Sequence, residues 1–188
     1  MQKYELWLYA GLTPSQVRVD VLKKEPWQAL RSILRGDDSY QYLKFIVDYN
    51  RRQPGSKIPK PASKMQKYEL WLYAGLTPSQ VRVDVLKKEP WQALRSILRG
   101  DDSYQYLKFI VDYNRRQPGS KIPKPASKMQ KYELWLYAGL SPSQVRVDIL
   151  KKAPHMKLEV LAEHKDFWQY AKFMVEYKRL NPNALVAI

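Results

Sequence analysis

The chain has 188 residues, of which 45% are hydrophobic and 13% aromatic, a composition that favours packed cores and argues against intrinsic disorder. It contains no cysteine, which excludes disulfide cross-links, thiolate metal ligands and catalysis by a cysteine nucleophile. No apolar run is long enough to predict a membrane span, and the formal net charge of +15 leaves a nucleic-acid partner open.

The sequence consists of three copies of one unit. Residues 1–64 (copy 1) recur letter for letter as residues 65–128 (copy 2), and residues 129–188 (copy 3) are a diverged version that aligns without a gap. This period is longer than that of most solenoid repeats, so each copy is predicted to be a small domain or helical bundle. The predicted boundaries are module 1 at 1–54, a basic proline-rich linker at 55–64, module 2 at 65–118, a second linker at 119–128, and module 3 at 129–188.

The first predicted element in copy 1 is a helix over residues 2–10. Tyr4, Trp7 and Leu8 follow the i, i+3, i+4 spacing of a buried helical face. Gly11 comes directly after this stripe, where a glycine commonly caps the end of a helix.

The next segment, residues 13–24, leaves two alternatives open. Thr13, Pro14 and Gln16 have the spacing of a capping box with proline at the first helical position, which favours a helix. The letters VRVDV at 17–21 alternate instead as a half-buried strand would, so a hairpin of 3–10 with 16–22 competes with the helix.

Two further helices are predicted before the linker. The segment from Pro26 carries Leu30, Ile33 and Leu34 at helical spacing, and Gly36 can end it. Asp38 with Gln41 predicts a second capping box. The helix that follows carries a stripe at i, i+3, i+4 and i+7 and ends near Gln53; the stripe consists of Tyr42, Phe45, Ile46 and Tyr49.

Copy 3 tests which positions form the core. Its stripe stays apolar while neighbouring positions change, for example Arg31 to Glu159, Gly36 to His164 and Arg52 to Leu180. Buried positions are constrained by volume and exposed ones are not, so the repeated rings are predicted to pack inward. The predicted core rings are Trp7, Tyr42, Phe45 and Tyr49, then Trp71, Tyr106, Phe109 and Tyr113, then Trp135, Tyr170, Phe173 and Tyr177.

The order of these features resembles the WY domain of oomycete RxLR-type effectors. The resemblance rests on LWLYAGLTPSQVRVDVL, on SYQYLKFIVDYNRRQP and, in copy 3, on DFWQYAKFMVEYKRLNP. It implies an all-α fold of three tandem bundles with three or four helices each, and therefore a helix at 13–24. Trp7, Trp71 and Trp135 would be the core tryptophan of the motif. Its tyrosine would fall on Phe45, Phe109 and Phe173, a departure from the usual residue, or one turn earlier on Tyr42, Tyr106 and Tyr170.

The resemblance also implies a function. Members of that family are secreted by plant pathogens, act inside the host cell in the cytoplasm or nucleus, and suppress immunity by binding host proteins without catalysis. A targeting segment is expected outside residues 1–188. Trp27 and Trp91 are candidate partner contacts, because copy 3 carries His155 at their position and exposed tryptophan is a common interface anchor. Arg51 and Arg52 are the other candidates.

No catalytic, cofactor-binding or metal-ligating set is predicted. His155 and His164 are the only histidines and are not joined by further ligands, and Asp37 and Asp38 are explained by helix capping. The phosphate-loop pattern G-x-x-x-x-G-K is absent.

The alternative function is a basic nucleic-acid-binding array, largely non-specific. A basic run without an acidic residue extends to position 64, although solvated linker charge is the simpler explanation of it; the run consists of Arg51, Arg52, Lys57, Lys60 and Lys64.

Overall fold

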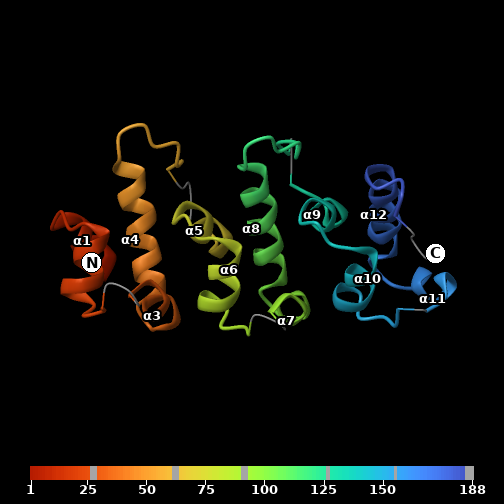
Figure 1. Ribbon diagram of the computed structural model, residues 1–188, viewed down its shortest axis with the longest axis horizontal. Coiled ribbons are helices and arrows are strands. Elements are labelled where there is room, and N and C mark those ends of the chain that lie inside the picture. Colours follow the sequence, from red (N-terminus) through yellow and green to blue (C-terminus); the bar gives the residue numbers. More distant parts are fainter. Residues whose placement is uncertain (26–28, 61–63, 90–92, 126–127, 155, 185–188) are drawn as a thin grey trace. The chain divides into compact units, whose positions relative to one another are not determined.

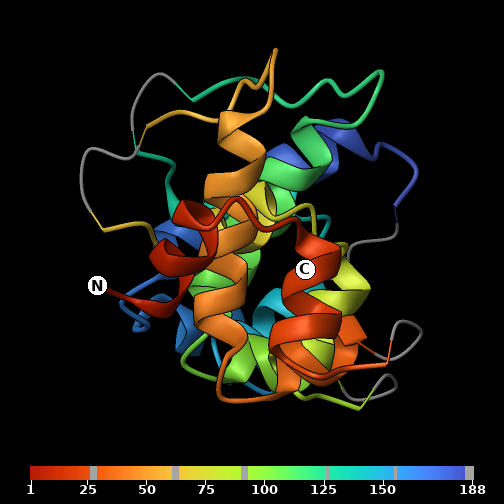
Figure 2. The ribbon, with the colours of Figure 1, turned by 90° about the vertical axis from the view of Figure 1, so that its left-hand side faces the viewer.

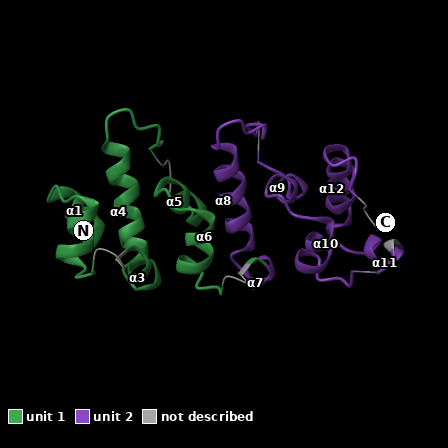
Figure 3. Cartoon of the chain, viewed as in Figure 1, with its two compact units in different colours: residues 1–94 green, residues 95–188 purple. Residues whose placement is uncertain are grey.

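The computed structural model describes residues 1–25, 29–60, 64–89, 93–125, 128–154 and 156–184. Every regular element in these ranges is a helix, and none of these residues lies in a strand, which confirms the predicted all-α class. The chain forms two compact units, Met1–Leu94 and Arg95–Ile188 (Figure 3).

The same order of elements recurs along the chain (Figure 1). Copy 1 contains α1 (Lys3–Tyr9), α2 (Pro14–Gln16), the π-helical turn η1 (Val17–Val21), α3 (Ala29–Arg35) and α4 (Ser39–Arg52). Copy 2 contains α5 (Lys67–Tyr73), α6 (Pro78–Gln80), η2 (Val81–Val85), α7 (Ala93–Arg99) and α8 (Ser103–Arg115). Copy 3 contains α9 (Lys131–Tyr137), α10 (Pro142–Gln144), η3 (Val145–Ile149), α11 (Leu158–Ala162) and α12 (Phe167–Leu180).

Helix α1 ends as its glycine predicts. Gly11 has a φ of 70°, the left-handed region that a side chain with a Cβ rarely adopts. Its N–H donates to the Leu8 carbonyl, and the Leu12 N–H donates to the Trp7 carbonyl at 3.1 Å. These bonds satisfy carbonyls that the last helical turn leaves free.

The segment after Gly11 is helical, so the hairpin alternative is wrong. The Gln16 N–H donates to Thr13 Oγ1 at 3.3 Å, and the Thr13 N–H donates to Gln16 Oε1 at 2.9 Å, which is the predicted capping box. The continuation is a π turn, in which the Leu22 N–H donates to the Val17 carbonyl. The helix ends at Val21 and Lys23 then has a φ of 52°, so residues 22–24, predicted to be helical, lie beyond its end.

The predicted capping box of Asp38 and Gln41 is wrong. Asp38 has a ψ of 3°, far from the extended backbone of a side-chain cap, and its side chain makes no cap bond. Asp38 Oδ1 instead accepts from Lys3 Nζ at 2.8 Å, and Gln41 Oε1 accepts from the Tyr4 N–H at 3.5 Å. Both side chains therefore serve the first turn of α1 rather than their own helix.

In unit 1 the core lies where α1 crosses α4 (Figure 1). The rings of Trp7 and Phe45 meet edge to face, with centroids 5.8 Å apart, and both are buried. Tyr49 is partly buried, with its ring centroid 5.9 Å from that of Phe45. The other rings predicted for unit 1, Tyr42 and Trp71, are also buried.

In unit 2 helix α9 packs on α12 in the same manner. Trp135 meets Phe173 edge to face at 6.1 Å. The remaining predicted rings of unit 2 are buried or partly buried; they are Tyr106, Phe109, Tyr113, Tyr170 and Tyr177.

Candidate interaction surface

Helix α4 is buried on two faces, and the second face contacts copy 2. Leu43 and Val47 lie on it, and Val47 packs against Met65 and Leu70, which precede and belong to α5. Ile58, from the predicted linker, packs against the same cluster. We call this contact between the α3–α4 part of copy 1 and the first half of copy 2 junction 1.

Unit 2 contains an equivalent contact, junction 2, between α8 and copy 3. Val111 is fully buried against Met129 and Leu134, and Ile122 packs beside them. These four residues correspond one for one to Val47, Met65, Leu70 and Ile58. The apolar part of the contact is therefore the same at both junctions.

Each junction also has a side-chain amide at its edge. Asn50 Nδ2 donates to the Tyr73 carbonyl at 3.3 Å, and Asn114 Nδ2 donates to the Tyr137 carbonyl at 3.4 Å. These carbonyls belong to the last residues of α5 and α9, where a helix leaves carbonyls without intrahelical partners. The amide is therefore a C-terminal cap supplied by the preceding copy.

Two arginines complete junction 1. Arg31 Nε and Arg35 Nε lie 3.3 and 3.9 Å from Asp84 Oδ1, and the Asp84 side chain is only 14% exposed. Arg35 Nη2 also donates to the Val83 carbonyl at 2.9 Å. A carboxylate so far removed from water depends on such partners, because an unpaired buried charge is costly.

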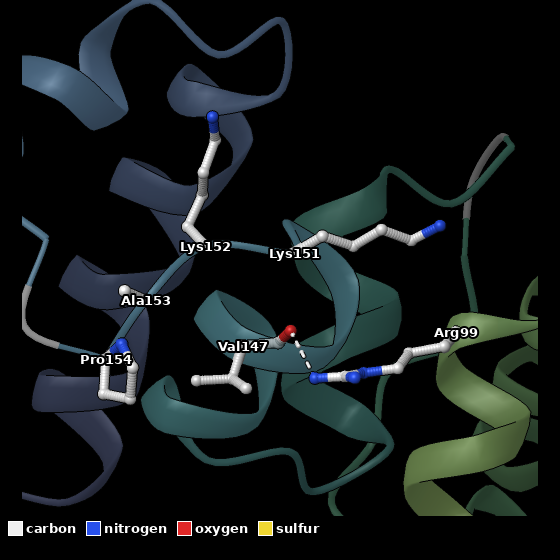
Figure 4. Close-up of a pocket in the computed structure, with 6 residues that line it drawn as sticks. All are labelled: Arg99, Val147, Lys151, Lys152, Ala153 and Pro154. Atoms are coloured by element: carbon white, nitrogen blue, oxygen red, sulfur yellow. Dashed lines mark hydrogen bonds between the residues drawn. The ribbon is translucent and has the colours of Figure 1, made fainter.

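Junction 2 repeats this arrangement with Arg95, Arg99 and Asp148. Arg95 Nε lies 3.3 Å and Arg99 Nη2 3.2 Å from Asp148 Oδ1, and that side chain is 10% exposed. Arg99 Nη2 donates to the Val147 carbonyl at 3.2 Å, the bond drawn in Figure 4.

The π turn explains why a main-chain carbonyl is available to the arginine. In η2 the Leu86 N–H donates to the Val81 carbonyl and the Lys88 N–H donates to the Arg82 carbonyl. Neither of these two bonds uses the Val83 carbonyl. Lys87, with a φ of 54°, ends the helix at this point. π turns of this kind often mark functional positions, and here the turn presents Val83 and Asp84 to α3.

A surface pocket of about 450 Å³ adjoins junction 2. Figure 4 shows that the Lys151 and Lys152 side chains point away from each other rather than into a common site. The pocket is lined by Arg99, Val147, Lys151, Lys152, Ala153 and Pro154. Its cationic groups do not converge on one position where an anion would lie.

The described residues contain no group of three or more His, Asp or Glu side chains that could hold a metal ion. His164 Nδ1 accepts a hydrogen bond from the Asp166 N–H at 3.1 Å, close to the start of α12, while His155 lies outside the described residues.

The predicted partner contacts are placed as follows. Trp27 and Trp91 lie outside the described residues. Arg51 is partly buried and donates through Nη1 to Asp48 Oδ1 on its own helix, whereas Arg52 is exposed at the end of α4.

Residues that correspond to buried junction residues are exposed at two places, on α1 and on α12. The sequence did not predict either of these exposed surfaces. Leu6 is 52% exposed although its counterpart Leu70 is 3% exposed, and Met1 and Tyr9 are exposed beside it. Val175 of α12 is 67% exposed although its counterpart Val47 is fully buried. The only signal in the sequence was the second apolar stripe, Leu43 and Val47 at i, i+4, beside the aromatic one.

Comparisons of the chain with known protein families, with curated proteins and with solved structures found no match. Within the described residues, no helix has both the length and the apolar character needed to cross a membrane.

Proposed function

We propose that the chain is a non-enzymatic scaffold for protein binding, built from three tandem helical bundles similar to the WY repeats of secreted plant-pathogen effectors. In this proposal it acts inside the host cell, binds a host protein and suppresses immunity. The proposal rests on the residues that resemble the WY motif and on the two matching junctions.

The observation that carries the proposal is the identity of the two junctions. Copy 1 holds the first half of copy 2, and copy 2 holds the first half of copy 3, through the same apolar, amide and arginine contacts. Contacts that repeat in this way give successive copies the same neighbours and leave equivalent side chains exposed. A partner with several binding sites would then gain avidity without any new kind of contact.

Exposed basic residues favour a second candidate, non-specific nucleic-acid binding. Arg52, Lys57, Lys60 and Lys64 are exposed, and no acidic residue lies between positions 51 and 64. Lys121, Lys124 and Lys128 are exposed at equivalent positions of copy 2.

One affinity capture separates the two candidates. The full chain is immobilised and exposed to plant extract with and without nuclease, beside a variant in which Lys57, Lys60, Lys64, Lys121, Lys124 and Lys128 are replaced by Gln. If the chain is a protein-binding scaffold, it captures the same host protein in all of these experiments. The purified chain and the purified host protein then bind each other directly. If every captured protein is lost after nuclease treatment and also with the Gln variant, the result would favour the nucleic-acid-binding array over the protein-binding scaffold.

A salt titration against DNA and RNA gives an independent readout. For the nucleic-acid array, log Kd changes linearly with log salt concentration, by roughly 0.9 for each phosphate contact on duplex DNA, irrespective of sequence.

For the scaffold, expression of the chain in leaf tissue lowers an immune response, and the captured host protein is required for that effect.

A further inference from the structure

The first half of copy 1 carries an exposed version of a surface that is covered in both other copies. We define the N-terminal face as Met1, Leu6, Tyr9 and Asp20. At junctions 1 and 2 the corresponding residues of α5, η2, α9 and η3 are covered by the preceding copy. Copies 1 and 2 are identical in sequence, so the N-terminal face has every side chain that forms the receiving side of junction 1. Within unit 1, the red ribbon of the first half of copy 1 lies in front of the orange ribbon of α3 and α4 in Figure 2.

The polar half of this face is uncovered as well. Asp20 is exposed and has no ion pair among the described residues, whereas its counterparts Asp84 and Asp148 are each held by two arginines. The η1 turn has the same π geometry as η2 and η3, so the Val19 carbonyl is presented as the Val83 carbonyl is. The face is therefore already arranged for a pair of arginines one helical turn apart.

Copy 3 lacks the side chains that would provide this contact. At the positions of Arg31 and Arg35 it has Glu159 and Glu163, both exposed. Ala171 replaces Leu43 and Lys178 replaces Asn50, and only Val175 keeps the identity of its counterpart. A second chain docked head to tail would bring the two glutamates to Asp20, so like charges would meet where the junctions pair opposite ones.

We propose that the N-terminal face is a docking surface for the α3–α4 face of another repeat of the copy 1 type, and that copy 3 ends such a series. The partner is thus a helical repeat with two arginines at i and i+4, followed by a helix with Leu, Val and Asn at i, i+4 and i+7. A second copy of this chain is rejected because its exposed end carries the two glutamates. The inference goes beyond the proposed function and does not depend on it.

The test restores the partner face on the full chain with the substitutions Glu159→Arg, Glu163→Arg, Ala171→Leu and Lys178→Asn. Sedimentation velocity over a range of concentrations is expected to give a constant sedimentation coefficient for the wild type and a rising one for the restored variant. Adding Leu6→Asp to the restored variant abolishes the rise, because Leu6 corresponds to Leu70, which is buried in the apolar cluster of junction 1. Equal circular dichroism spectra and melting curves show that all variants are folded.

A mixing experiment keeps the proposal testable if open-ended assembly lowers solubility. The restored variant with Leu6→Asp cannot bind itself, but it binds the wild type one to one through the wild-type N-terminal face. The same variant mixed with a Leu6→Asp, Asp20→Arg chain stays unbound.

Two results would overturn the proposal. A restored variant that is folded and monomeric, and that does not bind the wild type, means that the N-terminal face is not a docking surface. Wild-type self-association that Leu6→Asp removes means that copy 3 does not end the series. If the fourfold variant does not fold, Glu159→Arg with Glu163→Arg, both at exposed positions, gives weaker binding with the same dependence on Leu6.

Discussion

At the scale of single residues, the contact of Trp7 with Phe45 joins α1 to α4. The two rings lie edge to face, an arrangement that adds to the free energy of burying their surface. Trp7→Ala removes the indole from a packed core and is expected to lower the free energy of unfolding by about 3–5 kcal/mol. Denaturant unfolding followed by circular dichroism measures this loss.

Tyr9 offers the matched control on the same helix. Its side chain is 89% exposed, so Tyr9→Ala is expected to change stability by less than about 0.5 kcal/mol. Equal losses for the two variants would show that the Trp7 ring is not what joins α1 to α4.

Tyr42 makes stability depend on pH in the alkaline range. Burial raises the pKa of the Tyr42 hydroxyl above its ordinary value of 10.0, an effect that the charge of Arg18 partly opposes. A raised pKa means that the folded state favours the neutral ring, so this contribution to stability is complete below pH 10 and is lost as pH rises through the folded pKa. We expect Tyr42→Phe to make unfolding less dependent on pH above 10, measured by thermal melts at a series of pH values.

The control for this prediction is Tyr9→Phe, which removes a hydroxyl from an exposed ring. The slope of stability against pH above 10 is expected to stay as in the wild type. A Tyr42→Phe chain with the wild-type slope would contradict the assignment of the alkaline loss to the buried phenol.

At the scale of elements, the end of each π turn depends on a lysine in the left-handed region. Lys23, Lys87 and Lys151 have φ values of 52°, 54° and 57°, a region that costs a side chain with a Cβ roughly 1–2 kcal/mol. Lys87→Gly relieves that strain but adds freedom to the unfolded chain, so the expected net gain in stability is about 0.5–1 kcal/mol. Thermal melting measures it.

Lys88 is the matched control, because it is the next residue and its φ is not positive. Lys88→Gly adds freedom to the unfolded chain without relieving strain, and is expected not to raise the melting temperature. An increase of the same size for both variants would mean that strain at Lys87 is not the cause.

At the scale of the whole molecule, one position has two environments in different copies. Val47 is fully buried in junction 1, and Val175, at the same position of copy 3, is 67% exposed. Val47→Asp places an unpaired carboxylate in an apolar contact and is expected to cost roughly 3–5 kcal/mol. Val175→Asp is expected to cost less than about 0.5 kcal/mol.

Hydrogen exchange of the α4 and α5 amides measures the loss of the junction directly, beside denaturant unfolding of both variants. Equal exchange in the two variants would contradict the burial of Val47 between copies 1 and 2. A large loss for Val175→Asp would show instead that this position is covered in solution.

The local signals in the sequence predicted most of the elements correctly. The stripe Tyr42, Phe45, Ile46 and Tyr49 identified α4, and Thr13 with Gln16 identified the start of α2, because these features act between residues a few positions apart. The Asp38–Gln41 box has the same spacing and was wrong, because both side chains bond to α1 instead. A capping pattern cannot show which of two nearby helix starts its side chains will serve.

The sequence by itself determined the approximate extents of α1 and α4 and which rings share a face, since caps and periodicity are properties of a short stretch of chain. The same local signals left residues 13–24 open between a helix and a hairpin. It could not determine which copies of a face are covered. Met1 and Leu6 are exposed, whereas Met65 and Leu70, with the same neighbours in sequence, are buried. Only the tertiary structure decided this, because burial depends on what lies on the other side of the contact, and copy 1 has no preceding α3–α4 face among the described residues.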